Sequence, residues 1–180
     1  TYIMDGINVK KNLYIELSAK ENSLAFAASD QIQNVESLKC FLEGTWFLIY
    51  DKVKFSLNIY GKICNYFKKY ENILRQKRVF LKGFIEDRNK LDYELAKNKL
   101  FISPTVVGSG YRTKILEAGS IGIPVICTSF DFKPLSDYLK PGEDILISDN
   151  KKQLWEILRK VEQNLICLED ISKNFYSKLK

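Results

Sequence analysis

Two basic side chains and a carboxylate follow a glycine-rich turn in the second half of the chain. The turn is Gly108 to Gly110, and the charged residues are Arg112, Lys114 and Glu117. Glycines let the backbone approach a ligand closely, and free N–H groups at a helix start attract anions. Two cations in a first helical turn oppose the helix dipole unless they share an anion. The set indicates a phosphate site with a hydroxyl near the glutamate, as in a nucleotide; the alternative is a sheet loop with solvated charges.

The flanking residues predict the elements that must position this turn. Residues 100–102 are a short apolar run that ends at a proline, which is typical of a buried strand. An apolar stripe predicts a helix over 111–120, which Gly122 ends, and 123–127 reads as a second buried strand. Strand, turn, helix and strand form a right-handed crossover in a parallel sheet. The glycine turn is therefore expected at the carboxyl edge of that sheet.

The run from Gly108 to Ile126 resembles the donor-binding signature of GT-B glycosyltransferases, in particular the retaining glycosyl transferases group 1. The resemblance implies that the turn and the helix start hold the nucleotide pyrophosphate, and that Glu117 binds the ribose. The implied pyrophosphate residues are Gly108, Ser109, Gly110, Tyr111, Arg112, Thr113 and Lys114. One position departs from the family pattern: many members have a second glutamate eight residues before the first, where this chain has Ser109. Either this branch handles its donor differently, or it has lost catalytic competence.

Further site residues are expected in the loops after earlier strands. Relatives place an arginine and a lysine after the first strand, where this chain has Ser29 and Asn34, and Asn34 is equally well read as a helix N-cap. Lys62 follows a glycine after another strand and is a weak phosphate candidate, because the P-loop spacing is lacking. The resemblance implies that Phe84 and Ile85 face the nucleotide base, with a buried hydrophobic loop as the alternative for Phe84.

The remaining pattern predicts an α/β fold, a Rossmann-like three-layer α/β/α sandwich with a roughly six-stranded parallel sheet. By resemblance this is the C-terminal half of a GT-B fold. Residues 1–22 are expected to be a linker from an N-terminal domain, and 23–180 the nucleotide-sugar donor-binding domain. The other expected strands are 24–28, 55–60, 78–83 and 144–147, and the other expected helices are 35–50, 63–76, 87–97, 151–163 and a last one ending at 180, with a helical turn at 135–139.

Composition excludes several kinds of chemistry. The chain has 180 residues, a net charge of +6 and no histidine, which rules out a histidine base or ligand within it. The four cysteines are far apart and lack zinc spacing, which favours free thiols in a reducing cytoplasm. No apolar run is long enough to span a membrane, although a basic protein can associate peripherally with the inner face of an anionic one. No aromatic-basic nucleic-acid motif is present, so nucleic acid is not an expected partner.

Three functions remain open at this point. The first is the donor domain of a hexosyltransferase that uses a UDP or GDP sugar in polysaccharide biosynthesis, needs no metal or other cofactor, and is inactive without its own N-terminal acceptor domain. The acceptor would be a glycan, a lipid-linked sugar or a similar molecule. The second is a sugar-nucleotide epimerase of GT-B shape. The third is a non-catalytic nucleotide-binding or protein-interaction domain of the same shape.

Overall fold

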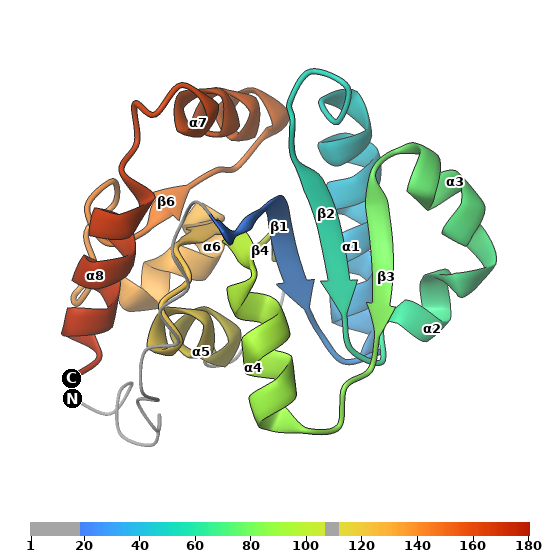
Figure 1. The fold of residues 1–180 in the computed structure, drawn as a ribbon, viewed down its shortest axis with the longest axis horizontal. Coiled ribbons are helices and arrows are strands. Elements are labelled where there is room, and N and C mark those ends of the chain that lie inside the picture. Colours follow the sequence, from blue (N-terminus) through green and yellow to red (C-terminus); the bar gives the residue numbers. More distant parts are fainter. Residues whose placement is uncertain (1–18, 107–111) are drawn as a thin grey trace.

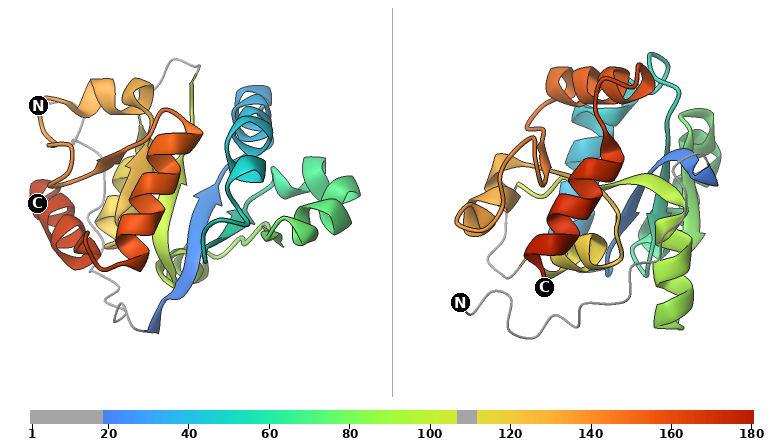
Figure 2. Two further views of the ribbon diagram at one scale, coloured as in Figure 1. Left: turned by 90° about the horizontal axis from the view of Figure 1, so that it is seen from above. Right: turned by 60° about the vertical axis from the view of Figure 1, so that its left-hand side comes forward.

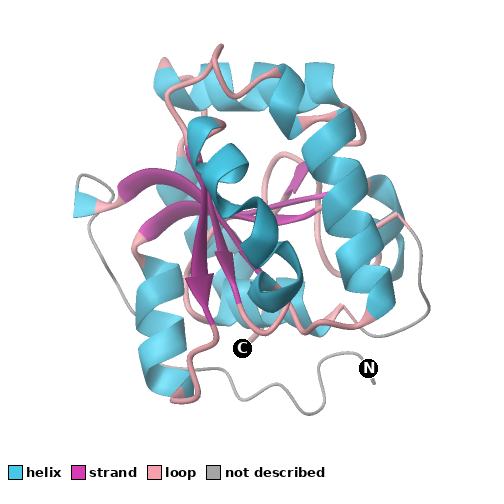
Figure 3. Cartoon of the chain, turned by 90° about the vertical axis from the view of Figure 1, so that its right-hand side faces the viewer, coloured by secondary structure: helices cyan, strands magenta, loops and turns pink. Residues whose placement is uncertain are grey.

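The computed structural model describes residues 19–106 and 112–180, which form one parallel six-stranded sheet between two layers of helices (Figures 1 and 3). The strands are β1 Glu21–Ala27, β2 Ser56–Tyr60, β3 Val79–Gly83, β4 Asn98–Ser103, β5 Val125–Cys127 and β6 Leu146–Ile147. The helices are α1 Ile32–Gly44, α2 Cys64–Phe67, α3 Glu71–Gln76, α4 Arg88–Ala96, α5 Thr113–Ser120, α6 Ser129–Phe132, α7 Lys151–Glu162 and α8 Leu168–Lys178. The sequence prediction of a Rossmann-like α/β fold is confirmed.

The strand order is β3-β2-β1-β4-β5-β6, and every pairing is parallel. The chain builds outward from β1 to β3 and then returns to the other side of β1 with β4. This reversal between β1 and β4 leaves a crevice outside the carboxyl ends of the strands, where doubly wound sheets bind ligands. The strand order alone therefore predicts where the candidate site lies, without reference to any side chain.

Alternating side chains of each strand enter two separate cores. Leu24 and Phe26 of β1 pack with the buried faces of α1 and α7, whereas Ala25 faces the opposite layer with α4 and α5. This alternation follows from the two-residue period of a strand. Both faces are apolar, as expected for a parallel sheet that is covered on both sides.

The last helix, α8, belongs to both cores. Its first buried residues, Leu168 and Ile171, pack with the α1–α7 layer, while Phe175 packs with the α4–α5 layer. Phe175 is fully buried against Gly119 of α5, where a Cβ would come within 2.8 Å of the phenyl ring. The Ser172 hydroxyl also donates a 2.7 Å hydrogen bond to the carbonyl of Gly122, just after α5. Helix α8 thus holds α5 in place from the β6 side of the sheet (Figure 2, right).

A buried polar cluster joins the central strands on the α4 side. The Asn98 side-chain oxygen accepts hydrogen bonds from Ser23 of β1 at 2.6 Å and from Asn58 of β2 at 2.8 Å. The Asn98 amide donates to the Tyr60 hydroxyl and to carbonyls at the end of α4. Burial raises the pKa of Tyr60 to about 12, so the phenol stays neutral. Because buried polar groups need partners, this cluster favours one pairing of β1, β2 and β4.

Two predicted helices need correction, and one short helix was not predicted. Helix α1 begins at Ile32, so Asn34 lies inside its first turn and is not an N-cap. The predicted helix 63–76 is two helices joined by a 3-10 turn over Lys68–Tyr70, where the N–H of Glu71 bonds to the carbonyl of Lys68, three residues back. The expected helical turn at 135–139 is present, since the N–H of Leu139 bonds to the carbonyl of Leu135, and a 3-10 turn over Lys133–Leu135 precedes it. The unpredicted short helix is α6; Thr128 caps it by accepting from the N–H of Asp131.

Candidate nucleotide-binding site

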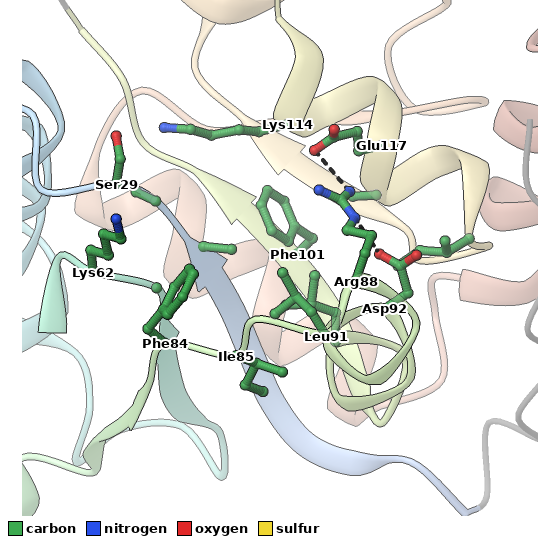
Figure 4. A pocket seen from close by; sticks show the side chains of 16 residues that line it. Ser29, Lys62, Phe84, Ile85, Arg88, Leu91, Asp92, Phe101, Lys114 and Glu117 are labelled. Carbon is green, nitrogen blue, oxygen red and sulfur yellow. Dashed lines mark hydrogen bonds and ion pairs between the residues drawn. The ribbon is translucent and has the colours of Figure 1, made fainter. Parts of the chain in front are cut away.

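A cavity of about 390 Å³ lies at the carboxyl ends of β1, β2 and β3, beside α4 and α5 (Figure 4). This volume is within the range of about 300–1,000 Å³ that is common for small-molecule sites. The cavity contains six of the residues predicted from the sequence: Ser29, Lys62, Phe84, Ile85, Lys114 and Glu117. They come from four different segments of the chain, so the fold brings together residues that are up to 88 positions apart (29 to 117).

Lys114 carries positive charge into the upper part of the cavity. Its amine donates a 2.6 Å hydrogen bond to the side-chain oxygen of Asn34, and the Asn34 amide donates to the hydroxyl and carbonyl of Ser29. Asn34 therefore links the β1–α1 loop to α5 and fixes the amine over the ends of the strands. Burial lowers the pKa of Lys114, and the carboxylates of Asp131 and Glu117 oppose this shift. A partly desolvated ammonium is attracted more strongly to an anion than an exposed one.

Arg112 points to a different partner from Lys114. Its Nε lies 2.9 Å from a carboxylate oxygen of Asp131, which is only 1% exposed, and its guanidinium lies 4.9 Å from the centre of the Phe130 ring. The Ser103 hydroxyl donates to the other oxygen of Asp131 at 2.6 Å. Burial raises the pKa of Asp131, and the bonds from Ser103 and Arg112 oppose that shift. The sequence predicted one anion shared by Arg112 and Lys114, but Arg112 is not among the described residues that line the cavity.

Glu117 is held by a residue that sequence reasoning missed. Arg88 of α4 contacts Glu117 at 3.1 Å through one nitrogen and Asp92 at 3.0 Å through another. Figure 4 shows Arg88 between the two carboxylates at the cavity wall. Asp92 is buried, which fixes the arginine, and the arginine fixes Glu117. The spacing of Arg88 and Asp92, four residues apart on a predicted helix, was the available signal.

Two lipophilic side chains face the lower part of the cavity after β3. Phe84 is 59% exposed, so it is not the buried loop residue that the sequence left open as an alternative. The Lys62 amine lies 5.3 Å from the centre of the Phe84 ring, a cation–π contact across the cavity mouth. Ile85 and Leu91 continue the apolar wall toward Phe101 (Figure 4). An exposed aromatic ring beside apolar side chains offers a surface on which a planar base can lie.

Gly61 allows the β1 and β2 loops to meet at the cavity floor. Its φ is +101°, and a Cβ at this position would overlap the carbonyl oxygen of Ala28. The Gly61 N–H donates to the carbonyl of Gly83 at 2.8 Å, which joins the β3 loop to the same point. Only glycine combines this conformation with this close approach.

The predicted residues 108–111 lie outside the described residues. Thr113 is the first residue of α5 and is exposed, but it does not appear among the described residues of the cavity wall. Helix α5 has Arg112 at its N-cap position and no side-chain cap there. The predicted role of the glycine turn therefore stays a prediction.

The model of the glycosyl transferases group 1 matches residues 21–164. The chain belongs to this family. Members of the glycosyl transferases group 1 share the sheet and the helices described above, and solved structures of GT-B proteins superimpose on the chain. No curated protein matches the sequence.

Three solved structures show how far the likeness extends. Staphylococcus aureus TarM, solved with UDP, α-GlcNAc-glycerol and fondaparinux, is 16% identical with a TM-score of 0.69; the match covers 96% of this chain and 34% of TarM. The lipopolysaccharide outer core galactosyltransferase WaaB is 18% identical with a TM-score of 0.67, covering 99% of this chain and 53% of WaaB. The C-terminal domain of LpcC from Francisella tularensis is 16% identical with a TM-score of 0.59, covering 89% of this chain and 85% of that domain.

The chain spans about a third of the length of TarM and about half of that of WaaB. The overlap is almost complete for the isolated C-terminal domain of LpcC. The chain therefore corresponds in fold to one half of a GT-B structure. Within residues 19–106 and 112–180, every helix is too short or too polar to cross a bilayer.

Proposed function

We propose that the chain is the donor-binding domain of a glycosyltransferase and that it holds a nucleoside diphosphate sugar in the cavity between α4, α5 and the ends of β1–β3. The observation that carries this proposal is the convergence of a partly buried lysine, a tethered glutamate and an exposed aromatic ring on one cavity at the switch point of the sheet. Family membership agrees with it, and the related TarM was solved with UDP.

Each part of the ligand has a matching group in the cavity. The diphosphate would lie by Lys114, with Lys62 on the opposite side, and the 108–112 turn would add backbone N–H groups. Glu117 would accept hydrogen bonds from the ribose, and the base would rest on Phe84 and Ile85. When the bond between sugar and phosphate breaks, the lysines would stabilise the charge on the leaving diphosphate. The sugar acceptor would be bound by an N-terminal acceptor domain.

The direct test is calorimetric titration of the 180-residue chain with UDP, GDP, ADP and their sugar conjugates, in magnesium and in EDTA. We expect one diphosphate to bind most tightly, with the same affinity in both buffers, because lysines replace a metal at the phosphates. Loss of binding in EDTA would contradict the metal-independent site. Failure of every nucleotide to bind would favour the non-catalytic alternative. Sugar transfer by this chain alone would show that the acceptor domain is not needed.

The role of Glu117 gives a specific prediction. Glu117→Ala should weaken nucleotide binding by about 1–3 kcal/mol, because the ribose loses a charged acceptor. The free energy of unfolding should change little, since the Glu117–Arg88 pair is about half exposed on both sides. Titration with UDP and with its 2′,3′-dideoxy analogue measures this. Wild type should prefer the ribose form, and the variant should bind both forms equally; a preserved preference would assign the ribose to another group.

The lowered pKa of Lys114 predicts a pH dependence. Diphosphate affinity should fall as pH rises through this pKa, below the ordinary lysine value of 10.5, because the neutral amine no longer attracts the phosphates. Stability should change in the opposite direction: the folded state binds the Lys114 proton more weakly than the unfolded state, so unfolding free energy rises with pH in the same window. Titration of wild type and Lys114→Arg across this range tests the assignment. The arginine variant should hold its affinity to higher pH, and an unchanged midpoint would exclude Lys114.

A further inference from the structure

The positive charge of the protein is concentrated in one short segment. The chain has 28 basic and 22 acidic residues. Residues 62–82 contain seven of the basic residues and one acidic residue, Glu71, so this segment alone has a net charge of +6. The remainder has 21 residues of each sign and is neutral. The basic residues of the segment are Lys62, Lys68, Lys69, Arg75, Lys77, Arg78 and Lys82.

This segment forms the outer edge of the fold. It runs through α2 and α3 to β3, the edge strand of the sheet, and α2 and α3 protrude from the body in the left view of Figure 2. Arg75 is paired with Glu71, and Arg78 donates to the carbonyl of Val53, so these arginines serve the local structure. Lys68, Lys69 and Lys82 are exposed.

Large apolar side chains are exposed between these lysines. Tyr66, Tyr70 and Ile73 are 49%, 43% and 56% exposed, although tyrosine and isoleucine are usually buried or half-buried. They recur at positions i, i+4 and i+7, and the Lys69 amine lies 4.9 Å from the centre of the Tyr70 ring. We call Tyr66, Lys68, Lys69, Tyr70 and Ile73 the α2–α3 surface.

A hollow of about 250 Å³ opens on this surface, between α1 and the α2–α3 segment. Its walls are mostly apolar and include Leu42, Phe47, Phe67 and Leu74 together with the exposed tyrosines. The donor cavity lies elsewhere, at the ends of β1–β3, and shares none of these side chains. The hollow is therefore a second feature that the proposed function does not use.

We propose that the α2–α3 surface binds an anionic lipid bilayer. Lysines beside tyrosines and an exposed aliphatic side chain match the interface of such a bilayer, where head groups meet the ammonium groups and the tyrosine rings lie at their level. Ile73 and the hollow fit acyl and glycerol groups, whereas a nucleic-acid backbone offers nothing apolar to an isoleucine. The charge complementarity is local, because the rest of the chain is neutral. The inference does not depend on nucleotide binding.

The test is co-sedimentation of the 180-residue chain with phosphatidylcholine vesicles that contain or lack phosphatidylglycerol. We expect binding to the phosphatidylglycerol vesicles and little to pure phosphatidylcholine. Exchange of Lys68 and Lys69 to Gln should weaken binding by at least about tenfold, since each lysine near an anionic surface adds to the attraction. The control exchanges two exposed lysines of α7, namely Lys151 and Lys152, to Gln and removes the same charge. Its binding should stay within about twofold of wild type.

Equal loss in both double variants would show attraction by net charge alone and would overturn the α2–α3 assignment. Absence of binding to phosphatidylglycerol vesicles would also overturn it. Competition with single-stranded RNA tests whether the surface binds nucleic acid instead. If RNA displaces the chain from the vesicles at a lower concentration than added phosphatidylglycerol does, the α2–α3 surface is a nucleic-acid surface and the proposal is overturned. Titration with UDP should be unchanged in both variants, because Lys62 and Phe84 are intact, so failure here is distinguishable from failure of the donor site.

A second pair of matched variants tests the apolar contribution to vesicle binding. Ile73→Ser should lower vesicle binding by about threefold or more, because insertion of apolar area into the interface supplies part of the affinity. Leu165→Ser removes an aliphatic side chain that is even more exposed, at 70%, from the turn between α7 and α8. This control should bind like wild type. Identical binding by Ile73→Ser and wild type would leave a purely electrostatic contact and contradict insertion at this surface.

Discussion

Lys114→Ala is expected to weaken binding of a nucleoside diphosphate by roughly 1.5–3 kcal/mol, or about ten- to 150-fold. The Lys114 amine is the positive group that the structure fixes in the upper cavity, through its 2.6 Å hydrogen bond to Asn34. Partial burial removes water that would otherwise screen the attraction to a phosphate. Titration calorimetry with UDP and GDP measures the loss.

Uridine or guanosine should bind the variant as it binds wild type, because in the proposed site Lys114 contacts the phosphates and Phe84 and Ile85 contact the base. Lys90→Ala is a matched variant, since Lys90 is exposed on the neighbouring helix α4 and does not appear in the described cavity wall. It should keep diphosphate affinity within about twofold. An equal loss for nucleoside and diphosphate would mean that Lys114 supports the shape of the pocket and not the charge of the ligand.

Gly61→Ala is expected to lower the free energy of unfolding by about 2–5 kcal/mol and to abolish nucleotide binding. A positive φ at a residue with a side chain costs roughly 1–2 kcal/mol. The new methyl group must also displace the backbone of Ala28, and overpacking of this kind costs about 1–3 kcal/mol more. The displaced loops carry Ser29 and Lys62, so the cavity changes with them. Urea unfolding followed by UDP titration measures both effects.

Gly142→Ala separates the two causes of the Gly61 effect. Gly142 has a φ of +82°, but a Cβ there would meet nothing within 4 Å. Its substitution should lower the unfolding free energy by only about 1–2 kcal/mol, from backbone strain alone, and leave nucleotide affinity unchanged. If both glycine variants lost the same stability, the close approach of the β1 and β2 loops would not matter to the fold.

The strands were predictable because each is a short apolar run that ends in turn residues. All six lie where the sequence placed them, with ends that differ by a few residues. The N-caps Asp87 and Asn150 are also local, since both side chains accept from the N–H groups two and three residues ahead. Such local interactions are encoded within four residues. The Thr128 N-cap of α6, which accepts from the N–H three residues ahead, is equally local and could have been found.

The errors arose where a side chain has a distant partner. Asn34 looks like an N-cap, but its amide bonds to Ser29 and accepts from Lys114, which is 80 residues away. Arg112 stays a predicted phosphate ligand, but the sequence did not indicate its contact with Asp131. Neither pairing can be read from spacing along the chain, because the folded sheet creates it. The list of cavity residues was more predictable than their partners, since the ends of parallel strands always meet at one edge.

Helix α8 has a consequence for how the molecule unfolds. Its two ends pack in different layers. Phe175 packs against α5, and the Ser172 hydroxyl bonds to the backbone just after α5, the helix that presents Lys114 and Glu117. Detachment of the C-terminal helix would therefore loosen both layers and the ligand cavity together. We expect the two layers to melt as one cooperative unit, and amide hydrogens in α5 to gain protection from exchange only while α8 is docked.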